Sequence, residues 1–252
     1  MGGGQRVRPL FMLIGRSDPA ETADRRSCST AGIAQVTDSH TGRMEASLVR
    51  ACRLIGVRDP RVLEAVGAVP RAAFVPPEVV DRADEDRPLP IPHGQVTTQP
   101  SLVARMIEAL ELSGGERVLE VGTGYGWQTA LLARLACEVW SVERFADVAD
   151  TARQNLRRQG AGRTHVVVGD GTEGLVEHQP FGGILVAAAF PRVPPPLAEQ
   201  LGNGGRLVMP IGPGGRDNVV QFVKTGDLLL RGRDVIPAYF VRLVGRHGFD
   251  EG

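Results

Sequence analysis

One stretch near the middle of the chain constrains its fold more than any other. Residues 117–127 read Arg-Val-Leu-Glu-Val-Gly-Thr-Gly-Tyr-Gly-Trp, so that an apolar strand with one carboxylate, Glu120, runs into a turn with three glycines. Glycine accepts positive φ and lets a ligand approach the backbone closely, and the free N–H groups of a following helix point at the same place. The stretch therefore predicts a ligand cradle at the end of a strand.

The spacing of these glycines, G-x-G-x-G, differs from the G-x-G-x-x-G fingerprint of dinucleotide sites, and Glu120 would place a like charge beside a pyrophosphate. S-adenosylmethionine carries an α-ammonium group and a sulfonium, so it suits the carboxylate better. The cradle favours this methyl donor; a plain structural loop and an NAD-dependent dehydrogenase are the alternatives. The donor-binding residues predicted here are Glu120, Gly122, Thr123, Gly124 and Gln128.

The composition is that of a globular protein, since 42% of the 252 residues are hydrophobic and 23% are charged. The apolar runs 10–14 and 184–190 are far shorter than the roughly 20 residues of a spanning helix, and the first is too short for a secretory signal, so we expect a cytoplasmic protein. The 29 basic and 29 acidic residues cancel, which predicts neither nucleic acid nor membrane as a partner. Cys28, Cys52 and Cys137 form no metal-ligand pattern and should be reduced thiols.

The first part of the chain divides into two segments. Residues 1–43 lack a sustained apolar period and are expected to be a disordered extension, with Met44 as an alternative start. Residues 44–99 are interpreted as a helical cap with a substrate loop. Leu48, Cys52 and Ile55 recur at helical spacing, and a second helix begins at Asp59-Pro60 and should bury Leu63, Val66 and Val69. The Pro-rich segment 74–92 is expected to be a loop.

Residues 100–252 alternate helix and strand, which predicts an α/β domain with a mainly parallel sheet and helices on both faces. The final strands follow one another at hairpin-like spacing, so the sheet should end in antiparallel strands. The expected helices are 101–111, 127–136, 145–158 and 195–201, and the expected strands are 117–121, 138–142, 164–168, 182–187, 205–210, 219–224 and 235–244.

Acidic residues end two further strands. Glu143 follows Glu120 by 23 residues, where an acid can accept both ribose hydroxyls of a nucleoside. Asp170 can accept from an adenine amino group, while Gly171 admits the flat ring. A solvated acid for Glu143 and a simple turn at Asp170-Gly171 are the alternatives. Ligands bind outside the carboxyl ends of parallel strands, so these side chains should converge on one adenosine.

The fourth strand ends in Ala188-Ala189-Phe190-Pro191, where a DNA or amine N-methyltransferase would often place Asn or Asp before Pro-Pro-aromatic. No side-chain acceptor for an amine is present, which favours an oxygen nucleophile. The small alanines leave room for a substrate or allow tight packing.

From about residue 59 to residue 249 the chain resembles the protein-L-isoaspartate (D-aspartate) O-methyltransferase family. The hydroxyl-bearing loop before the cradle and the Phe-Val-Pro segment are distinctive of this family, whereas the other motifs also occur in related donor-binding folds. The motifs that carry the resemblance are Phe74-Val75-Pro76, Gly94 to Pro100, Val118 to Gly126, Ser141 to Arg144, Gly169-Asp170-Gly171 and Gly204 to Gly212.

The resemblance implies a class I methyltransferase (Rossmann-like) fold and roles for particular residues. Thr98 takes the place of the family's active-site serine, with Val96-Thr97-Thr98 where Thr-Ile-Ser is usual. Gln95, Thr97 and Arg144 are implied to bind the donor. Val96, Ala188, Phe190 and Arg242 are implied to contact substrate. The family usually has Pro or Ala at Phe190, Asp at Gly182 and Val-Pro-Leu around Arg242, and these departures concern substrate preference more than methyl transfer.

The implied reaction is methylation of an isoaspartyl (or D-aspartyl) carboxylate in damaged proteins and peptides, followed by succinimide formation and partial return to aspartate. Such a carboxylate is ionised at neutral pH and needs no strong base. We expect a monomer without a metal. Two other functions remain open at this point: a methyltransferase for an aspartate of one dedicated precursor peptide, and a non-catalytic adenosine- or peptide-binding module. His93 and His247 are expected to be solvated or to make local hydrogen bonds. Arg242 and Arg246 either attract the carboxylates of a peptide or are solvated side chains on an edge strand.

Overall fold

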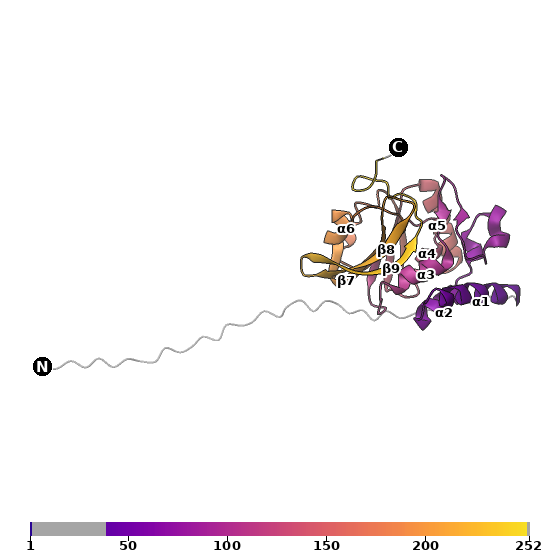
Figure 1. Cartoon of the computed structure of the whole chain (residues 1–252), viewed down its shortest axis with the longest axis horizontal. Coiled ribbons are helices and arrows are strands. Elements are labelled where there is room, and N and C mark those ends of the chain that lie inside the picture. The colour runs from indigo at the N-terminus through magenta and orange to yellow at the C-terminus, as the bar shows by residue number, and fades with distance from the viewer. Residues whose placement is uncertain (2–38, 251–252) are drawn as a thin grey trace.

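The computed structural model describes Met1 and residues 39–250, and a seven-stranded sheet lies at its centre (Figure 1). The strand order is β5-β4-β3-β6-β7-β8-β9, with parallel pairing from β5 to β7 and antiparallel pairing of β8 and β9. The predicted mainly parallel sheet with an antiparallel end is confirmed. The strands are β3 (Arg117–Val121), β4 (Glu138–Glu143), β5 (Thr164–Val168), β6 (Phe181–Val186), β7 (Leu201–Ile211), β8 (Asp217–Thr225) and β9 (Leu228–Ala238).

Helices cover both faces of this sheet because its inner strands are apolar on both sides. Val118 of β3 belongs to a core with α4 and α5, whereas its neighbour Leu119 belongs to a second core with Leu197 of α6. Successive residues of a strand point to opposite faces, which explains the division. The helices of this part are α3 (Pro100–Glu108), α4 (Trp127–Leu132), α5 (Ala146–Arg158), α6 (Pro195–Gln200) and the 3-10 turn η3 (Val176–His178).

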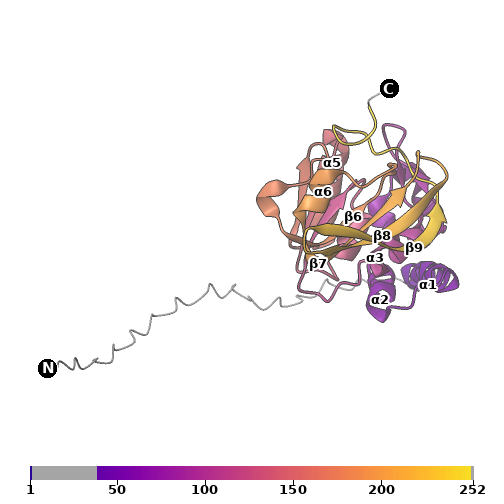
Figure 2. The same ribbon diagram turned by 60° about the vertical axis from the view of Figure 1, so that its left-hand side comes forward.

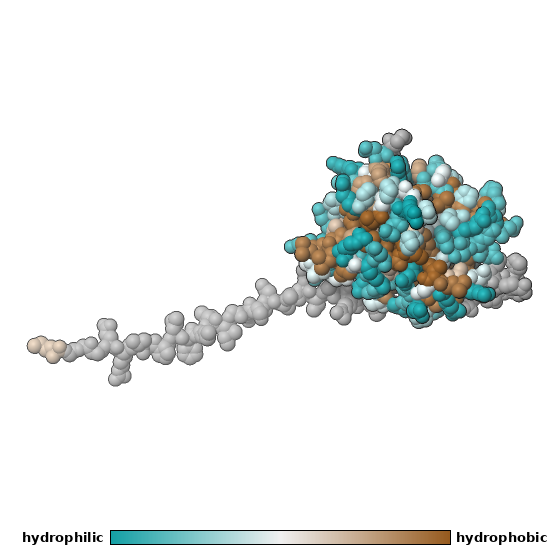
Figure 3. Space-filling model, in the orientation of Figure 1, coloured by the Kyte–Doolittle hydropathy of each residue, from teal (hydrophilic) through white to brown (hydrophobic). Residues whose placement is uncertain are grey.

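The last strand lies earlier than the sequence pattern indicates. The prediction placed it at 235–244, but β9 spans Leu228–Ala238 and forms a hairpin with β8 across Gly226, whose φ is +57°. The tight turn places Leu228 opposite Thr225 at once. Residues 239–244 follow β9, and Arg242 forms an isolated parallel bridge with Ala189 after β6, so this segment can line a site at the end of β6. The edge strand exposes Leu228 and Leu230, and Figure 3 shows hydrophobic residues interspersed with hydrophilic ones over the face seen in Figure 1.

Two N-terminal helices, α1 (Ser39–Leu54) and α2 (Pro60–Ala68), pack beside α3 at one side of the domain (Figures 1 and 2). Helix α1 begins before Met44; the rest of the segment 1–43, apart from Met1, lies outside the described residues, as does Cys28. Both helices share the core of α3 and α4, so they are continuous with the sheet domain. The buried stripe of α2 consists of Val62, Ala65 and Val66, with Val69 after it; Leu63 is only half-buried.

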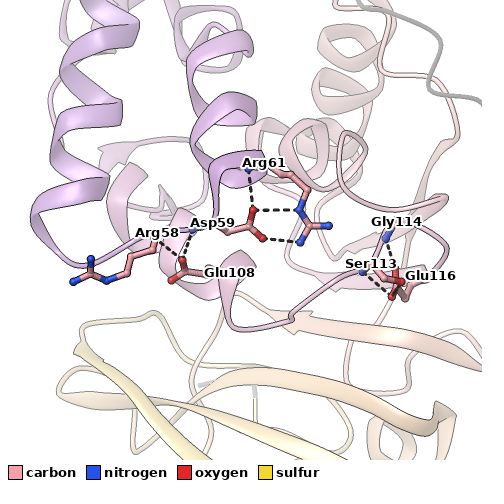
Figure 4. Close-up of polar contacts among 7 residues, drawn as sticks. All are labelled: Arg58, Asp59, Arg61, Glu108, Ser113, Gly114 and Glu116. Carbon is pink, nitrogen blue, oxygen red and sulfur yellow. Dashed lines mark hydrogen bonds and ion pairs between the residues drawn. The ribbon is translucent and has the colours of Figure 1, made fainter.

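Polar side chains fix how this helical pair joins the domain (Figure 4). Asp59 caps α2 by accepting a hydrogen bond from the Arg61 N–H at 2.9 Å, as its sequence predicts. Glu108, at the end of α3, accepts from the backbone N–H groups of Arg58 and Asp59 at 2.6 and 2.8 Å. Glu116 accepts from Ser113 and Gly114 and orders the turn that leads into β3.

The segment 74–92 is more regular than the prediction of a loop. It contains part of η1 (Arg71–Phe74), the 3-10 helix η2 (Pro77–Arg82) and the strand β1 (Leu89–Pro90), which pairs antiparallel with β2 (Val96–Thr97). The prolines that suggested a loop instead open η2 and end β1. This pairing carries residues 91–98 toward the sheet.

Candidate active site

A cavity lies at the carboxyl ends of β3 and β4, between the glycine turn and the segment 91–98. Several parts of the chain, far apart in sequence, form its wall. The predicted site residues that line it are Gln95, Val96, Thr97, Thr98, Gly122, Thr123, Gly124, Gln128, Glu143, Arg144, Gly171 and Arg242. The predicted residues that do not line it are Glu120, Asp170, Ala188 and Phe190.

The glycine turn has the conformation that its sequence predicts. Gly122, Gly124 and Gly126 have φ values of +93°, +54° and +94°, a region that other residues rarely adopt. A Cβ on Gly126 would lie 3.2 Å from Leu156 of α5, so this glycine also permits close packing of the turn on that helix. The Gly124 N–H donates to Glu143 at 2.9 Å, which joins the ends of β3 and β4.

Glu120 does not face the cavity. Its side chain is fully buried on the same face of β3 as Val118, and its carboxylate accepts hydrogen bonds from Gln128 (2.9 Å), Thr129 (2.5 Å) and Ser141 (2.6 Å). Burial raises the pKa of Glu120 to about 7, although the three hydrogen bonds oppose this rise. The prediction that Glu120 contacts the ammonium of the donor is thus wrong in this geometry: the carboxylate instead ties α4 to the two strands.

Gln128 connects this buried carboxylate to the cavity. Its amide nitrogen donates to Glu120, which fixes the orientation of the amide. Its Oε1 is buried and has no hydrogen-bond partner among the described residues, yet the side chain lines the cavity. A buried acceptor without a donor is costly, and a bound N–H donor would satisfy it.

Glu143 is a buried carboxylate at the end of β4, with 7% of its surface exposed. Its Oε2 accepts from Gly124 and its Oε1 from the Phe145 N–H at 3.2 Å. The alternative of a solvated strand-end acid is wrong, because the side chain is held in the cavity wall. Arg144 and Phe145 continue this wall, and the Arg144 guanidinium lies 4.9 Å from the centre of the Phe145 ring.

Asp170 and Gly171 are adjacent in sequence but have different roles. Gly171 lines the cavity, and a Cβ there would lie 2.4 Å from Val121. Asp170 turns away: one oxygen accepts from Thr172 and the other from the Arg246 N–H at 2.7 Å. Burial alone would raise the pKa of Asp170, but the hydrogen bonds from Arg246 and Thr172 outweigh it and hold the pKa below its usual value. The predicted contact of Asp170 with adenine is not present in this geometry; the carboxylate anchors the C-terminal turn.

The segment 95–98 forms the opposite wall. Val96 is 43% exposed and lines the cavity, as do Gln95 and Thr98. The Thr97 hydroxyl accepts from Arg71 at 2.9 Å and from the Leu89 N–H at 3.3 Å, so it orders the segment. The Thr98 hydroxyl has no hydrogen-bond partner within the described part of the chain, which leaves it available to a ligand.

Arg71 holds this wall in place, and sequence analysis did not identify it. Only 3% of its surface is exposed, and its guanidinium donates to the carbonyls of Glu85 (2.8 Å) and Arg87 (2.9 Å) as well as to Thr97. Burial lowers the pKa of Arg71 to about 10, which leaves it charged at neutral pH. The signal in the sequence is weak: a single arginine just before the Phe74-Val75-Pro76 segment.

The C-terminal segment forms a further part of the cavity wall, together with the residue directly after β6. Ala187 lines the cavity, whereas Ala188 does not; Phe190 packs edge-on against Phe249, with ring centres 5.0 Å apart. Ala188 and Phe190 therefore lie outside the lining of this cavity, and contact of these two residues with substrate stays a prediction. Four residues of the C-terminal segment line the cavity: Val241, Arg242, Leu243 and Val244. Only Arg242 was predicted, because the others were assigned to a strand. The further lining residues that sequence analysis missed are Phe74, Ile91, Val103, Val121, Tyr125, Gly126, Trp127, Val142, Phe145, Val148 and Ala187.

Other features of the described residues add no second chemistry. Within residues 39–250, no group of three or more His, Cys, Asp and Glu side chains is arranged to hold a metal ion, and no helix has the length and apolarity that crossing a membrane requires. Cys52 is buried, and burial raises the pKa of its thiol to about 12. The His247 N–H donates to Thr172 at 3.0 Å and helps to dock the C-terminal turn.

The parallel sheet, the glycine turn with Glu143 at the next strand end, and the cavity beside them define the class I methyltransferase fold. The described structure superposes on a solved protein-L-isoaspartate O-methyltransferase with a TM-score of 0.72 and 28% identity, covering 81% of this chain and 67% of that one. A second solved structure, a putative protein-L-isoaspartate O-methyltransferase from Plasmodium falciparum in complex with S-adenosyl-L-homocysteine, gives a TM-score of 0.66 at 22% identity over 79% of this chain and 98% of that one.

Sequence comparison then identifies the family. The model of the protein-L-isoaspartate(D-aspartate) O-methyltransferase (PCMT) family matches residues 43–248. Proteins named protein-L-isoaspartate O-methyltransferase from Methanoculleus marisnigri and Anaeromyxobacter dehalogenans strain 2CP-1 are 49% and 52% identical, over 78% and 75% of this chain and 89% and 91% of their own lengths. The chain belongs to the PCMT family.

Proposed function

We propose that the chain is an S-adenosylmethionine-dependent enzyme that methylates the carboxylate of L-isoaspartyl (or D-aspartyl) residues in damaged proteins and peptides. One observation carries the proposal: the glycine turn with Glu143 and the Thr98 hydroxyl line the same cavity in a chain of this family. In the methyl ester the backbone nitrogen of the next residue can attack the ester carbonyl and displace methanol, which forms a succinimide; addition of water to the succinimide then returns part of it to aspartate.

The cavity suits the donor at several points. Gln128 offers an unpartnered buried acceptor that fits the α-ammonium group of the donor. Glu143 has lone pairs beyond the two it uses with Gly124 and Phe145, and these can accept ribose hydroxyls. Gly171 also lines the cavity, and because it has no Cβ its backbone can pack directly on Val121 in the cavity wall. When bound, the donor supplies an electrophilic methyl group on a sulfonium.

The residues of the chain act on the acceptor by position more than by proton transfer. A carboxylate with a reference pKa of about 4 is already ionised at neutral pH, so no general base is required. The Thr98 hydroxyl would donate a hydrogen bond to one acceptor oxygen and orient the other toward the methyl group. Arg71 fixes the backbone that carries Thr98, with a bond to its carbonyl at 3.4 Å. This arrangement would accelerate methyl transfer by aligning the reacting atoms in a site that excludes water.

The test is transfer of a tritium-labelled methyl group to a short isoaspartyl peptide and to its aspartyl twin, together with calorimetry of the donor alone. Labelling of the isoaspartyl peptide only, with donor binding, supports the proposal. Donor binding without labelling of any isoaspartyl peptide would instead favour the non-catalytic binding module, which the available Thr98 hydroxyl argues against.

A second candidate function rests on two departures that line the cavity. Val96 and Arg242 form part of the wall opposite the glycine turn, whereas Phe190, the third departure, lies away from it. These two residues suit a methyltransferase for an aspartate in one dedicated precursor peptide. Activity on assorted isoaspartyl peptides excludes this candidate, and activity on only one normal aspartyl peptide excludes repair.

The remaining features of the proposal concern partners and place. We infer isoaspartyl-containing proteins or peptides as the partners of a cytoplasmic monomer, with no nucleic acid or membrane. The balance of 29 basic and 29 acidic residues supports this, since a neutral chain has no net attraction to anionic polymers. Light scattering on a sizing column measures the oligomeric state, and a mass of twice 27.0 kDa contradicts the monomer.

A further inference from the structure

A contact beside the cavity joins two segments that are far apart in the chain. His93 lies in the turn between β1 and β2, and its ring stacks on Phe145 with centres 4.1 Å apart and planes 5° from parallel. Its Nε2 lies 2.9 Å from both carboxylate oxygens of Asp147, in the first turn of α5. The side chain thus reaches from the Thr98 segment to the Glu143 side. We name this contact among His93, Phe145 and Asp147 the loop clamp.

Of the three residues of the loop clamp only Phe145 lines the cavity, but lining residues adjoin the contact on both sides. On one side Gln95 lines the cavity and donates to the His93 carbonyl at 3.1 Å. On the other side Phe145 lines the cavity, next to Glu143. Separation of the clamp would therefore part the two walls at the Glu143 end.

The two ends of the 91–98 segment are held very differently. Its base is held by the buried Arg71, which bonds Thr97 and the carbonyl of Thr98. Its tip is held by His93, whose side chain is 39% exposed, and by Asp147, whose side chain is 63% exposed. Both His93 and Gly94 have positive φ, +60° and +66°, as a tight turn requires. Exposed polar contacts are weak, so the tip can open while the base stays fixed.

We propose that His93 is a positioning residue whose clamp on Phe145 and Asp147 closes the nucleoside end of the cavity and controls exchange of the donor and its demethylated product. The inference rests on the proposed function, because it takes the Glu143 side as the nucleoside end. His93 acts through Phe145 and Gln95, and the chemistry at Thr98 proceeds without it. Opening of the clamp sets how long a nucleoside stays bound.

The principal variant is His93→Asn, since asparagine tolerates the left-handed conformation but is too short to make the stack and the hydrogen bond. We expect S-adenosylhomocysteine to dissociate about five- to tenfold faster by stopped-flow measurement, which is the summed effect of one exposed hydrogen bond to a carboxylate and one ring stack. Association should change little, because differences in affinity reside mostly in dissociation. Asp147→Asn should give the same direction with a smaller factor.

The matched control is Asp150→Asn. Asp150 lies on the same helix α5, is exposed and pairs with Arg153, outside the cavity wall. This variant makes the same change of charge and should leave nucleoside dissociation within twofold of wild type. The double variant of His93→Asn and Asp147→Asn should change little beyond His93→Asn alone, because the two residues share one contact.

Hydrogen exchange in the ligand-free protein gives a readout independent of turnover. In His93→Asn the amides of residues 93–96 should exchange about five- to tenfold faster, while those of β3 stay protected. Two results would contradict the proposal: equal rates of nucleoside release from wild type and His93→Asn, or effects of His93→Asn and Asp147→Asn on that rate that add fully in the double variant. In either case the loop clamp does not control exchange. If wild type binds neither S-adenosylmethionine nor S-adenosylhomocysteine, the proposed function fails instead, and the exchange data still report on the clamp.

Discussion

The two walls of the cavity are built in different ways. The wall around the glycine turn arises from adjacent strands and the helix that follows, tied by a fully buried network around Glu120. The opposite wall is assembled from segments far apart in the chain, with Arg71 holding residues 85–98 and Asp170 holding the C-terminal turn. The first wall is pre-organised for a constant ligand. The second depends on a few polar anchors, which leaves its lining residues, such as Val96 and Arg242, open to change with the substrate.

The largest expected effect comes from removing the anchor of the second wall. Arg71→Ala leaves the carbonyls of Glu85 and Arg87 and the Thr97 hydroxyl without their buried donor, so we expect a loss of about 3 kcal/mol of unfolding free energy. For a chain of this length the melting temperature should fall by roughly 6–12 °C. Calorimetric melting measures the change. Arg71→Lys should recover only part of the loss, because an ammonium cannot reproduce the planar fork. A fall of less than 2 °C in Arg71→Ala contradicts the role of Arg71 as an anchor.

The network of the first wall should appear as a dependence of stability on pH. Because the pKa of Glu120 rises on folding from 4.5 to about 7, the folded state holds the proton more tightly than the unfolded state. This group's contribution is fully present below pH 4.5 and is lost as the pH rises through about 7, with an upper size of about 3 kcal/mol. Urea titrations at pH 5 and pH 8 should show a smaller pH difference for Glu120→Gln than for wild type. Equal pH differences in the two proteins would show that Glu120 does not titrate in this way.

The sequence predicts the wall around the glycine turn better than the opposite wall, because the first is built from adjacent segments and the second from distant ones. Strands β3 and β5 and the positive φ of the glycines follow from local patterns, and the structure confirms them. The orientation of the Glu120 side chain does not follow from a local pattern, because a motif does not reveal which face of a strand packs against a helix. The contact of Asp170 with adenine was predicted from its position after a strand. The sequence does not show that the C-terminal segment folds back, so that the Arg246 N–H donates to this carboxylate. Residues 241–244 and Arg71 depend on contacts across long stretches of chain, which no local pattern contains.

The hydroxyl of Thr98 tests whether the second wall contributes to the chemical step. Thr98→Ala removes a donor to the acceptor carboxylate, and we expect kcat for an isoaspartyl peptide to fall by about 10- to 100-fold, equal to one hydrogen bond to a charged group. The affinity for the donor should be unchanged, because the glycine turn is untouched. Thr98→Ser keeps the hydroxyl and should retain most of kcat. If Thr98→Ala and Thr98→Ser have the same kcat, the hydroxyl does not orient the acceptor, and alignment must come from the backbone of this wall.

The smallest effect should arise where the two walls meet. Asp170 follows β5, next to Gly171 in the cavity wall, and its carboxylate accepts from Arg246 in the turn after Val241–Val244. Asp170→Asn removes the charge and weakens these hydrogen bonds, so we expect a loss of about 1 kcal/mol in stability and a KM for peptide that rises by about two- to fivefold. Since the folded pKa of Asp170 is depressed, its contribution is present above pH 3.8 and is lost as the pH falls through the folded value. The variant should therefore differ most from wild type near neutral pH, by urea unfolding. A KM for donor that rises as much as that for peptide would show that Asp170 supports both walls equally, and the separation between a fixed and an adjustable wall would not hold at this position.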